Sequence, residues 1–447
     1  MSGMPLSATG YWTAVYFGGS AKFCAGEKVE DIRSEKDRSV LSALAREVRF
    51  LSERSREQEK RELWYNHNDL LERYPLVLAD PENGWNEVIT ENMLECTDNL
   101  AKRWEWILRR DIFWGKKLLD DRPIERVFEI GYTYTDSEWG IDIVYRGGED
   151  GTAYMWEPAI TNPKDIDRIQ IPQIEVDYET TEKTLDLARS IFGDELEVKL
   201  TGLNRDSASP HMSRDLAKMV GFEAMMVKMV EEPETIHRIM NKFLQGHLAK
   251  LDFLQDHDLL SLNNDYSYVG SGGIGYTREL PRREIGPGQS VRTEDLWLLT
   301  ESQETVGISP EMFEEFIFPY QIPLHERFGL NCYGCCEPLD RRWHVIQGIP
   351  NLRRVSVSPW ADEEKMAANL GGSCIYSRKT NPADLAKPRM DEKRVRESIR
   401  NTLEITRGGC VVELVMKDNH TIGGNPQNIV RWVEVAREEI ERIYGRI

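Results

Sequence analysis

The chain has 447 residues, of which 40% are hydrophobic and 30% are charged, so it can bury a sizeable core and keep a well-solvated surface. Its formal net charge of −19 opposes nucleic acid as a partner, because that affinity depends on neutralising phosphates. No run approaches the roughly 20 uncharged apolar residues that cross a bilayer, and residues 1–5 lack the basic start of a signal peptide. We therefore expect a cytoplasmic protein with neither nucleic acid nor a membrane as a partner.

Residues 1–120 are predicted to form a helical extension that packs on the main body. Glutamate–arginine pairs and spaced apolar residues predict a long helix between Arg46 and Leu71, which Pro75 ends. A second helical region contains four tryptophans, Trp85, Trp104, Trp106 and Trp114. We expect most of these rings to fix the helices to the main body, because large aromatic side chains dominate packing.

From about residue 125, short β-rich runs alternate with helical segments. The predicted strands cover residues 126–130, 196–200, 259–263, 296–300, 330–333, 354–358, 373–377 and 410–416. Prolines at positions 233, 310 and 426 begin predicted helices among them. Strands that alternate with helices form parallel βα units, and eight of them favour a closed barrel over an open sheet. The sequence therefore predicts an α/β fold with a (β/α)8 TIM-type barrel over residues 121–447.

The glycine cluster Gly270–Gly275 does not begin an amphipathic helix. A dinucleotide-binding loop requires a glycine-rich turn between a strand and a helix. We therefore interpret this cluster as a mobile loop or lid.

In a (β/α)8 barrel the active site lies at the C-terminal ends of the strands, and this rule selects polar residues that follow the predicted strands. The predicted catalytic residues are Glu301, Asp265 and Glu337, whose carboxyl groups can transfer protons. The predicted substrate-binding residues are Tyr333, Trp360, Tyr376, Lys379 and Asn264.

The cysteines indicate a reducing compartment. There are seven, Cys24, Cys96, Cys332, Cys335, Cys336, Cys374 and Cys410, and an odd, sparse set in a long chain is typical of free thiols. Three of them fall within five residues.

The turn Tyr333-Gly334-Cys335-Cys336-Glu337 is the predicted chemical centre. Two thiols follow an apolar strand there, and His420 follows the last strand. Thiolate and imidazole are zinc ligands, and an open fourth position makes a zinc site catalytic. We predict a zinc ion bound by His420 and by one thiol of the Cys335–Cys336 pair. Two alternatives stay open: small buried cysteines, or a reactive thiolate near the start of a helix.

Three segments carry a family resemblance. They are residues 308–320 (ISPEMFEEFIFPY), residues 379–385 (KTNPADL) and residues 420–429 (HTIGGNPQNI). They resemble, in order, a helix before the fifth or sixth strand, an Asn-x-x-Pro-x-x-Leu turn in shifted form, and the last strand-to-helix turn of the uroporphyrinogen decarboxylase superfamily. This superfamily includes the methyltransferases of corrinoid-dependent systems. The resemblance covers roughly residues 120–447.

The resemblance also implies site residues. The superfamily's methyltransferases carry a His-x-Cys pair where this chain has Tyr333-Gly334-Cys335, and a later cysteine near His420. This implies Cys335 as a zinc ligand, His420 in place of the later thiol, and Cys336 or Glu337 as the remaining ligand. An early Arg-x-x-Gly-Arg motif, which holds carboxylates in the decarboxylase, has no counterpart in residues 1–50. The resemblance therefore favours methyl transfer over decarboxylation.

The implied function is a methyltransferase that moves a methyl group between a small methylated substrate, such as an aryl methyl ether or a methylamine, and a separate corrinoid protein. Zinc, or an acid such as Glu301 or Asp265, would assist the leaving group. The resemblance implies that the corrinoid would be carried on a partner protein.

Three matters stay open at this point. A metal-independent decarboxylase or lyase, with Arg378 and Lys379 beside a substrate carboxylate, is the alternative function. A catalytically silent scaffold for a corrinoid domain is a third hypothesis. Whether the chain forms a homodimer is not determined by its sequence.

Overall fold

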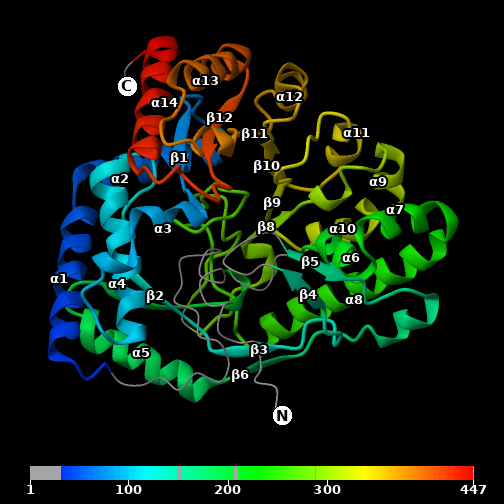
Figure 1. Cartoon of the computed structure of the whole chain (residues 1–447), viewed down its shortest axis with the longest axis horizontal. Helices are drawn as coiled ribbons and strands as arrows, with labels where there is room; N and C mark the ends of the chain where they lie inside the picture. Colours follow the sequence, from blue (N-terminus) through cyan, green and yellow to red (C-terminus); the bar gives the residue numbers. More distant parts are fainter. Residues whose placement is uncertain (1–31, 148–153, 206–209, 287, 446–447) are drawn as a thin grey trace.

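The computed structural model describes residues 32–147, 154–205, 210–286 and 288–445, and its centre is a six-stranded parallel sheet (Figure 1). The strand order is β1-β12-β11-β10-β9-β8. The strands are β1 (Leu76–Ala79), β8 (Trp297–Thr300), β9 (Leu330–Tyr333), β10 (Leu352–Val357), β11 (Ile375–Lys379) and β12 (Val411–Met416). Because every neighbouring pair is parallel, the six C-terminal ends lie at one edge of the sheet.

The predicted α/β fold is confirmed, and so are the five predicted strands between residues 296 and 416. All residues of β9, β11 and β12 are buried. Parallel strands are covered on both faces, which explains the nearly continuous apolar sequence of β12 and the burial of even the polar residues of β11. Side chains alternate between the two faces.

Strand β1 was not predicted. Its four residues, Leu76–Ala79, pair in register with Glu413–Met416 of β12, so a segment of the N-terminal region is part of the central sheet. A run of four apolar residues is too short to reveal a period of two, and it follows a long polar helical region. This omission matters because Asp80 and Glu82, directly after β1, lie at the C-terminal edge of the sheet.

The N-terminal region is otherwise helical. Its helices are α1 (Glu35–Ser52), α2 (Ser55–Asn68), α3 (Trp85–Val88) and α4 (Asn99–Phe113). The long helix predicted between Arg46 and Leu71 is two helices, since the chain turns at residues 53–54. The predicted packing role of the tryptophans is confirmed for Trp85, Trp104 and Trp114, which are fully buried.

Further helices connect and cover the sheet strands (Figure 1). They are α9 (Pro310–Phe316), α10 (Phe318–His325), α11 (Trp343–Ile346), α12 (Glu363–Leu370), α13 (Glu392–Thr406) and α14 (Gln427–Tyr444). The predicted start at Ser309 is confirmed, because its hydroxyl accepts a hydrogen bond from Met312 N at 3.2 Å.

The remaining strands form three small sheets. Strand β2 (Val127–Gly131) pairs in parallel with β7 (Glu197–Thr201), as the two predicted strands require. Two antiparallel pairs join β3 (Tyr134–Asp136) to β6 (Ile174–Val176) and β4 (Val144–Gly147) to β5 (Tyr154–Glu157). The helices of this half are α5 (Tyr178–Phe192), α6 (Met212–Val220), α7 (Phe222–Glu231) and α8 (Pro233–Asp256).

The predicted strand over residues 259–263 is wrong, and the segment is irregular. It lies between β7 and β8, but side-chain amides replace the backbone ladder on both sides. Asn204 Oδ1 accepts from Ser261 N at 2.8 Å, and Asn263 Oδ1 accepts from Trp297 N at 3.0 Å. Because no continuous ladder among the described residues joins the β2–β7 pair to the six-stranded sheet, the structure does not confirm the closed barrel.

The glycine cluster, which we predicted to be a mobile loop or lid, is a buried loop. Most of residues 270–276 are buried against the face of the sheet that carries Arg354 and Val415, which we call the inner face. A Cβ at Gly273 would lie 2.5 Å from the Arg354 guanidinium, and one at Gly275 would lie 1.9 Å from Asn263 O. These positions need glycine because the loop touches other parts of the chain so closely.

Within the described ranges, the helices are all too short or too polar to span a membrane.

Candidate active site

The two adjacent thiols lie in a turn at the C-terminal end of β9. Gly334 starts this turn at φ +90°, a conformation that favours glycine. Both Cys335 and Cys336 are half-buried, and their Sγ atoms are 3.5 Å apart. The turn therefore presents both thiols at the edge of the sheet where active sites of parallel α/β proteins lie.

Asp418 joins the thiols from the end of β12. Its Oδ2 lies 3.4 Å from Cys336 Sγ, and one ligand atom from each of Cys335, Cys336 and Asp418 lies within 4.8 Å of the others. We call these three residues the thiol–carboxylate group. The sequence predicted that only one of the adjacent thiols would face a metal, whereas the structure turns both toward the same carboxylate.

A buried ammonium lies beside this group. Lys417 Nζ is 3.1 Å from Asp418 Oδ1 and 3.3 Å from Glu82 Oε1. It also donates to Ser271 Oγ at 3.1 Å, and the Ser271 hydroxyl donates to Cys335 Sγ at 3.2 Å. Burial would lower the pKa of Lys417, but Glu82 and the Cys335 thiol raise it well above its ordinary value, so the ammonium stays charged.

These contacts make the two thiols different. The hydrogen bond from Cys336 lowers the pKa of Cys335 to about 7, with further help from Lys417. The same interaction and burial raise the pKa of Cys336 well above its ordinary value. The pair therefore shares one proton near neutral pH, and Cys335 carries the negative charge.

The site also contains two buried carboxyl groups, those of Glu337 and Glu301. Glu337 Oε2 accepts from Cys335 N and its Oε1 accepts from Ser302 N, both at 2.9 Å. Glu337 thus fixes the thiol turn to the end of β8, and burial together with Glu301 raises its pKa to about 7.

Glu301 follows β8 and forms the second carboxyl site. Its Oε1 is 3.4 Å from His211 Nδ1 and 3.5 Å from Ser213 Oγ, which donates to Glu304 Oε2 at 2.7 Å. Burial and the neighbouring Glu304 carboxylate raise the pKa of Glu301 to about 8. Glu301 is therefore protonated at neutral pH and can act as a general acid.

Lys379 is the predicted binding residue that lies on the inner face of the sheet. Its Nζ donates to Ser377 Oγ at 2.6 Å, and the Ser377 hydroxyl donates to Glu413, which pairs with Arg354 at 3.0 Å. In the described part of the chain this is the single hydrogen bond of the ammonium, although Lys379 is 2% exposed. Burial lowers its pKa to about 8.

The other predicted binding residues are not brought to the thiol–carboxylate group. Tyr333 and Tyr376 point to the helix side of the sheet, where their hydroxyls donate to Gln321 of α10 at 3.0 Å and to Glu363 O of α12 at 3.3 Å. In β9 and β11 they alternate with inward-facing residues, which explains their direction. Trp360 is 69% exposed.

Three more predicted residues lie at other positions. Asn264 donates to Leu280 O at 2.7 Å. Asp265 accepts from Ser267 N at 2.9 Å and lies 3.3 Å from Lys199. His420 is exposed, two residues beyond Asp418, and it is not part of the thiol–carboxylate group. Position at the end of a strand was therefore not enough to select the residues that meet.

Several site residues were missed. Glu82 follows the unpredicted strand β1, and Ser271 belongs to the loop that we took for a lid. Lys417 and Asp418 directly follow β12, so alternation along that strand could have selected Lys417. Glu304 is close to Glu301 in sequence, whereas no sequence signal relates His211 to Glu301.

The thiol–carboxylate group fits a zinc ion. Ligands at about 2.0–2.3 Å from a tetrahedral ion lie about 3.3–3.8 Å from one another, and the Cys335–Cys336 and Cys336–Asp418 separations are 3.5 and 3.4 Å. Three protein ligands would leave one position open for a substrate atom. Lys417 would neutralise part of the negative charge of this donor set.

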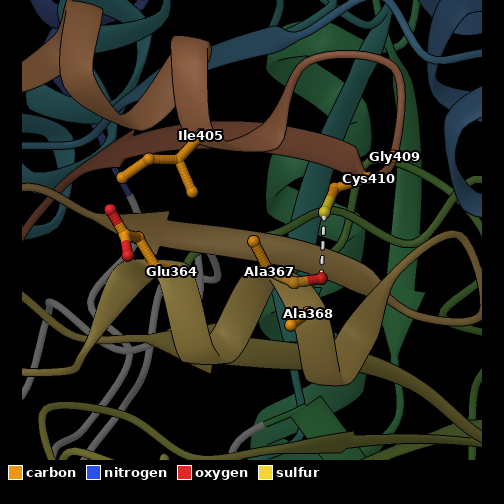
Figure 2. Close-up of a pocket in the computed structure, with 6 residues that line it drawn as sticks. All are labelled: Glu364, Ala367, Ala368, Ile405, Gly409 and Cys410. Atoms are coloured by element: carbon orange, nitrogen blue, oxygen red, sulfur yellow. Dashed lines mark hydrogen bonds between the residues drawn. The ribbon is translucent and has the colours of Figure 1, made fainter.

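A separate hollow of about 430 Å³ lies between α12 and the segment that leads into β12 (Figure 2). It is lined by Glu364, Ala367, Ala368, Ile405, Gly409 and Cys410. Cys410 Sγ donates to Ala367 O at 3.6 Å across it. Because Cys410 precedes β12 and Asp418 follows it, the hollow and the thiols are at opposite ends of the strand.

No protein-family model matches the chain, and no curated protein matches it. The structure is similar to that of a methyltransferase from Methanosarcina mazei, with a TM-score of 0.45 and 9% sequence identity, over 82% of this chain and 94% of the other. A likeness at this level assigns neither fold nor function.

Proposed function

We propose that this protein transfers a methyl group between a small methylated substrate and a corrinoid carried by a separate protein. The observation that supports the proposal most is the thiol–carboxylate group beside the protonated Glu301. The family resemblance of residues 308–320, 379–385 and 420–429 points to the same chemistry.

The chemical need is a better leaving group. A methyl ether or methylamine is a poor methyl donor because its oxygen or nitrogen leaves as a strong base. A proton transferred to that atom lowers the barrier, and such general acid catalysis typically raises the rate by a factor of about 10²–10⁴. Glu301 holds such a proton in a buried position, and Glu304 keeps it there by repelling the ionised form.

Zinc bound at Cys335, Cys336 and Asp418 would act as a Lewis acid on the same leaving atom. The residues around it have separate tasks. Glu337 holds the thiol turn through two backbone amides, and Lys417 fixes the orientation of Asp418. His420 as a ligand would require its exposed side chain to turn toward the thiols.

The architecture that we propose is an incomplete version of the predicted barrel. The β2–β7 pair and residues 259–263 would close the six-stranded sheet through side-chain hydrogen bonds such as those of Asn263. Residues 1–120 remain a proposed N-terminal region, from which β1 enters the sheet. A cytoplasmic location and a corrinoid-protein partner belong to the same proposal.

A decarboxylase or lyase is supported by one observation, the buried and incompletely bonded ammonium of Lys379. Its proposed companion Arg378 is already engaged, since it donates to Ser358 O at 2.5 Å and to Glu363 at 2.7 Å. A single cation is a weaker basis for holding a substrate carboxylate, so we prefer methyl transfer.

The two functions give different products. Purified protein is supplied with methoxylated aromatic acids and methylamines, with and without a Co(I) corrinoid, and methylcorrinoid and carbon dioxide are measured together. Methyl transfer predicts methylcorrinoid that depends on the protein, with no release of carbon dioxide. Carbon dioxide from the same substrates without methylcorrinoid would reject methyl transfer and support the lyase.

A further inference from the structure

The adjacent thiols differ from the other described cysteines in exposure. Cys335 and Cys336 are half-buried, whereas Cys96, Cys332, Cys374 and Cys410 are buried. Thiols react with solutes when they are accessible and carry thiolate character. Among the described cysteines, this pair therefore combines access with a neighbouring thiol at 3.5 Å.

The residues around the two sulfur atoms give them different chemical roles. Cys335 Sγ accepts a hydrogen bond from Ser271, which in turn accepts one from the Lys417 ammonium. Both contacts stabilise a thiolate at Cys335. Cys336 Sγ lies 3.4 Å from the Asp418 carboxylate, which can accept its proton. Cys335 is thus arranged as the attacking thiol, and Cys336 as the thiol that resolves a mixed disulfide.

A bond between these neighbours would be reversible. Consecutive Cα atoms lie about 3.8 Å apart, which is shorter than the roughly 4.4–6.8 Å usual for disulfides. Such a bond is strained, and strained disulfides are the readily reduced ones. The turn around the pair has no helix or strand hydrogen bonds to break, so its closure leaves the sheet intact.

We propose that Cys335 and Cys336 form a reversible oxidation site, which a low-molecular-weight disulfide such as glutathione disulfide converts into an intramolecular disulfide. The Cys335 thiolate attacks one sulfur of the oxidant and releases one thiolate, which takes a proton from water. Cys336 then gives its proton to Asp418 and attacks Cys335 Sγ, and the second small thiolate leaves and takes that proton from Asp418. Two cysteine thiols are oxidised and one disulfide is reduced, so two electrons balance.

The consequence for activity rests on the proposed function. The disulfide removes both sulfur donors from the thiol–carboxylate group, and thiolates are the form that binds zinc. Oxidation would therefore release the metal and stop methyl transfer, and a dithiol reductant would restore both.

The test uses the full-length protein, reduced and freed of metal by a chelator, then exposed to glutathione disulfide. Cys332 lies in the same tryptic peptide as the pair, between Arg327 and Arg341, so the experiment is done in the Cys332→Ala variant. The peptide should lose two hydrogens and regain them with dithiothreitol. Cys336→Ala in this background should instead accumulate one glutathione on Cys335.

Three outcomes would overturn the proposal. In the first, the pair stays unmodified under conditions in which glutathione disulfide oxidises a dithiol control peptide. In the second, both cysteines carry stable glutathione. In the third, adducts form equally fast in the Cys335→Ala and Cys336→Ala variants. Added zinc should slow the oxidation of the reduced pair. Because mass is the readout, absence of methyl transfer would reject the proposed function and leave the oxidation site standing.

Discussion

The Cys336 thiol lies 3.4 Å from the Asp418 carboxylate, although the two residues are 82 positions apart in sequence. The contact forms because β9 and β12 end at the same edge of a parallel sheet. It brings a carboxylate, rather than the predicted imidazole of His420, to the adjacent thiols. The ligand set of the proposed zinc site depends on this contact.

The Asp418→Asn substitution should weaken zinc binding, because it removes an ionised ligand and keeps the size of the side chain. We expect a loss at least as large as the about 10–100-fold that follows removal of an outer hydrogen-bond partner. His420→Gln is the matched control, since His420 is exposed and outside the group. Metal titration of the two variants decides the matter: a stronger effect of His420→Gln would return the histidine to the ligand set.

Glu301→Gln should reduce the rate of methyl transfer by about 10²–10⁴-fold, because it removes the proposed general acid. In the wild-type protein the turnover number should fall as the pH rises through about 8, where Glu301 loses its proton. The Glu304→Gln substitution removes the neighbouring charge, so this fall should move to lower pH. An unchanged pH profile in Glu304→Gln would show that Glu301 is not the titrating acid.

Lys379→Met should weaken the binding of carboxylate-bearing ligands and leave neutral analogues of the same shape unaffected. In the wild-type protein, this binding should decline as the pH rises through about 8, because the ammonium then loses its charge. A dissociation constant measured by calorimetry separates this effect from the turnover effect of Glu301. Equal losses for a methoxybenzoate and the corresponding amide would contradict an anion-binding role.

Glu337→Gln should loosen the thiol turn, because the amide nitrogen cannot accept the hydrogen bond that one carboxylate oxygen now receives from Cys335 N or Ser302 N. Loss of a buried hydrogen bond to a charged group costs about 1.5–3 kcal/mol. We expect a lower free energy of unfolding and faster alkylation of Cys335. Glu304→Gln serves as the control because Glu304 does not contact the turn; slower alkylation in Glu337→Gln would contradict the positioning role.

The sequence predicted the parts of the fold in which local pattern and tertiary environment agree. Strands β8 and β12 are mostly apolar, and clear helix starts such as Ser309-Pro310 separate the strands of the sheet. The prediction failed where a strand is very short or where side-chain hydrogen bonds replace the backbone ladder. Leu76–Ala79 is too short for its period to be seen, and residues 259–263 are apolar enough for a strand but are held by the amides of Asn204 and Asn263.

The sequence predicted where the candidate site lies better than it predicted which residues form it. The turn at Cys335, Cys336 and Glu337 follows from the end of β9, and Glu301 follows from the end of β8. Tyr333 and Tyr376 were predicted wrongly because position near the end of a strand does not select a face, whereas the alternation of side chains places both on the helix side. Lys417 was missed although alternation along β12 points to it, whereas Ser271 depends on a buried loop whose path no local pattern reveals.

The most direct test of the central claim is methylation of a Co(I) corrinoid by the wild-type protein and by the Cys335→Ser and Cys332→Ser variants, followed by absorbance. Cys332 is a neighbouring buried thiol outside the thiol–carboxylate group, so it controls for the loss of any cysteine. The proposal predicts methylcorrinoid formation by the wild type and Cys332→Ser, and its loss in Cys335→Ser. Equal methylation by all three proteins would contradict a role for the thiol–carboxylate group in the reaction.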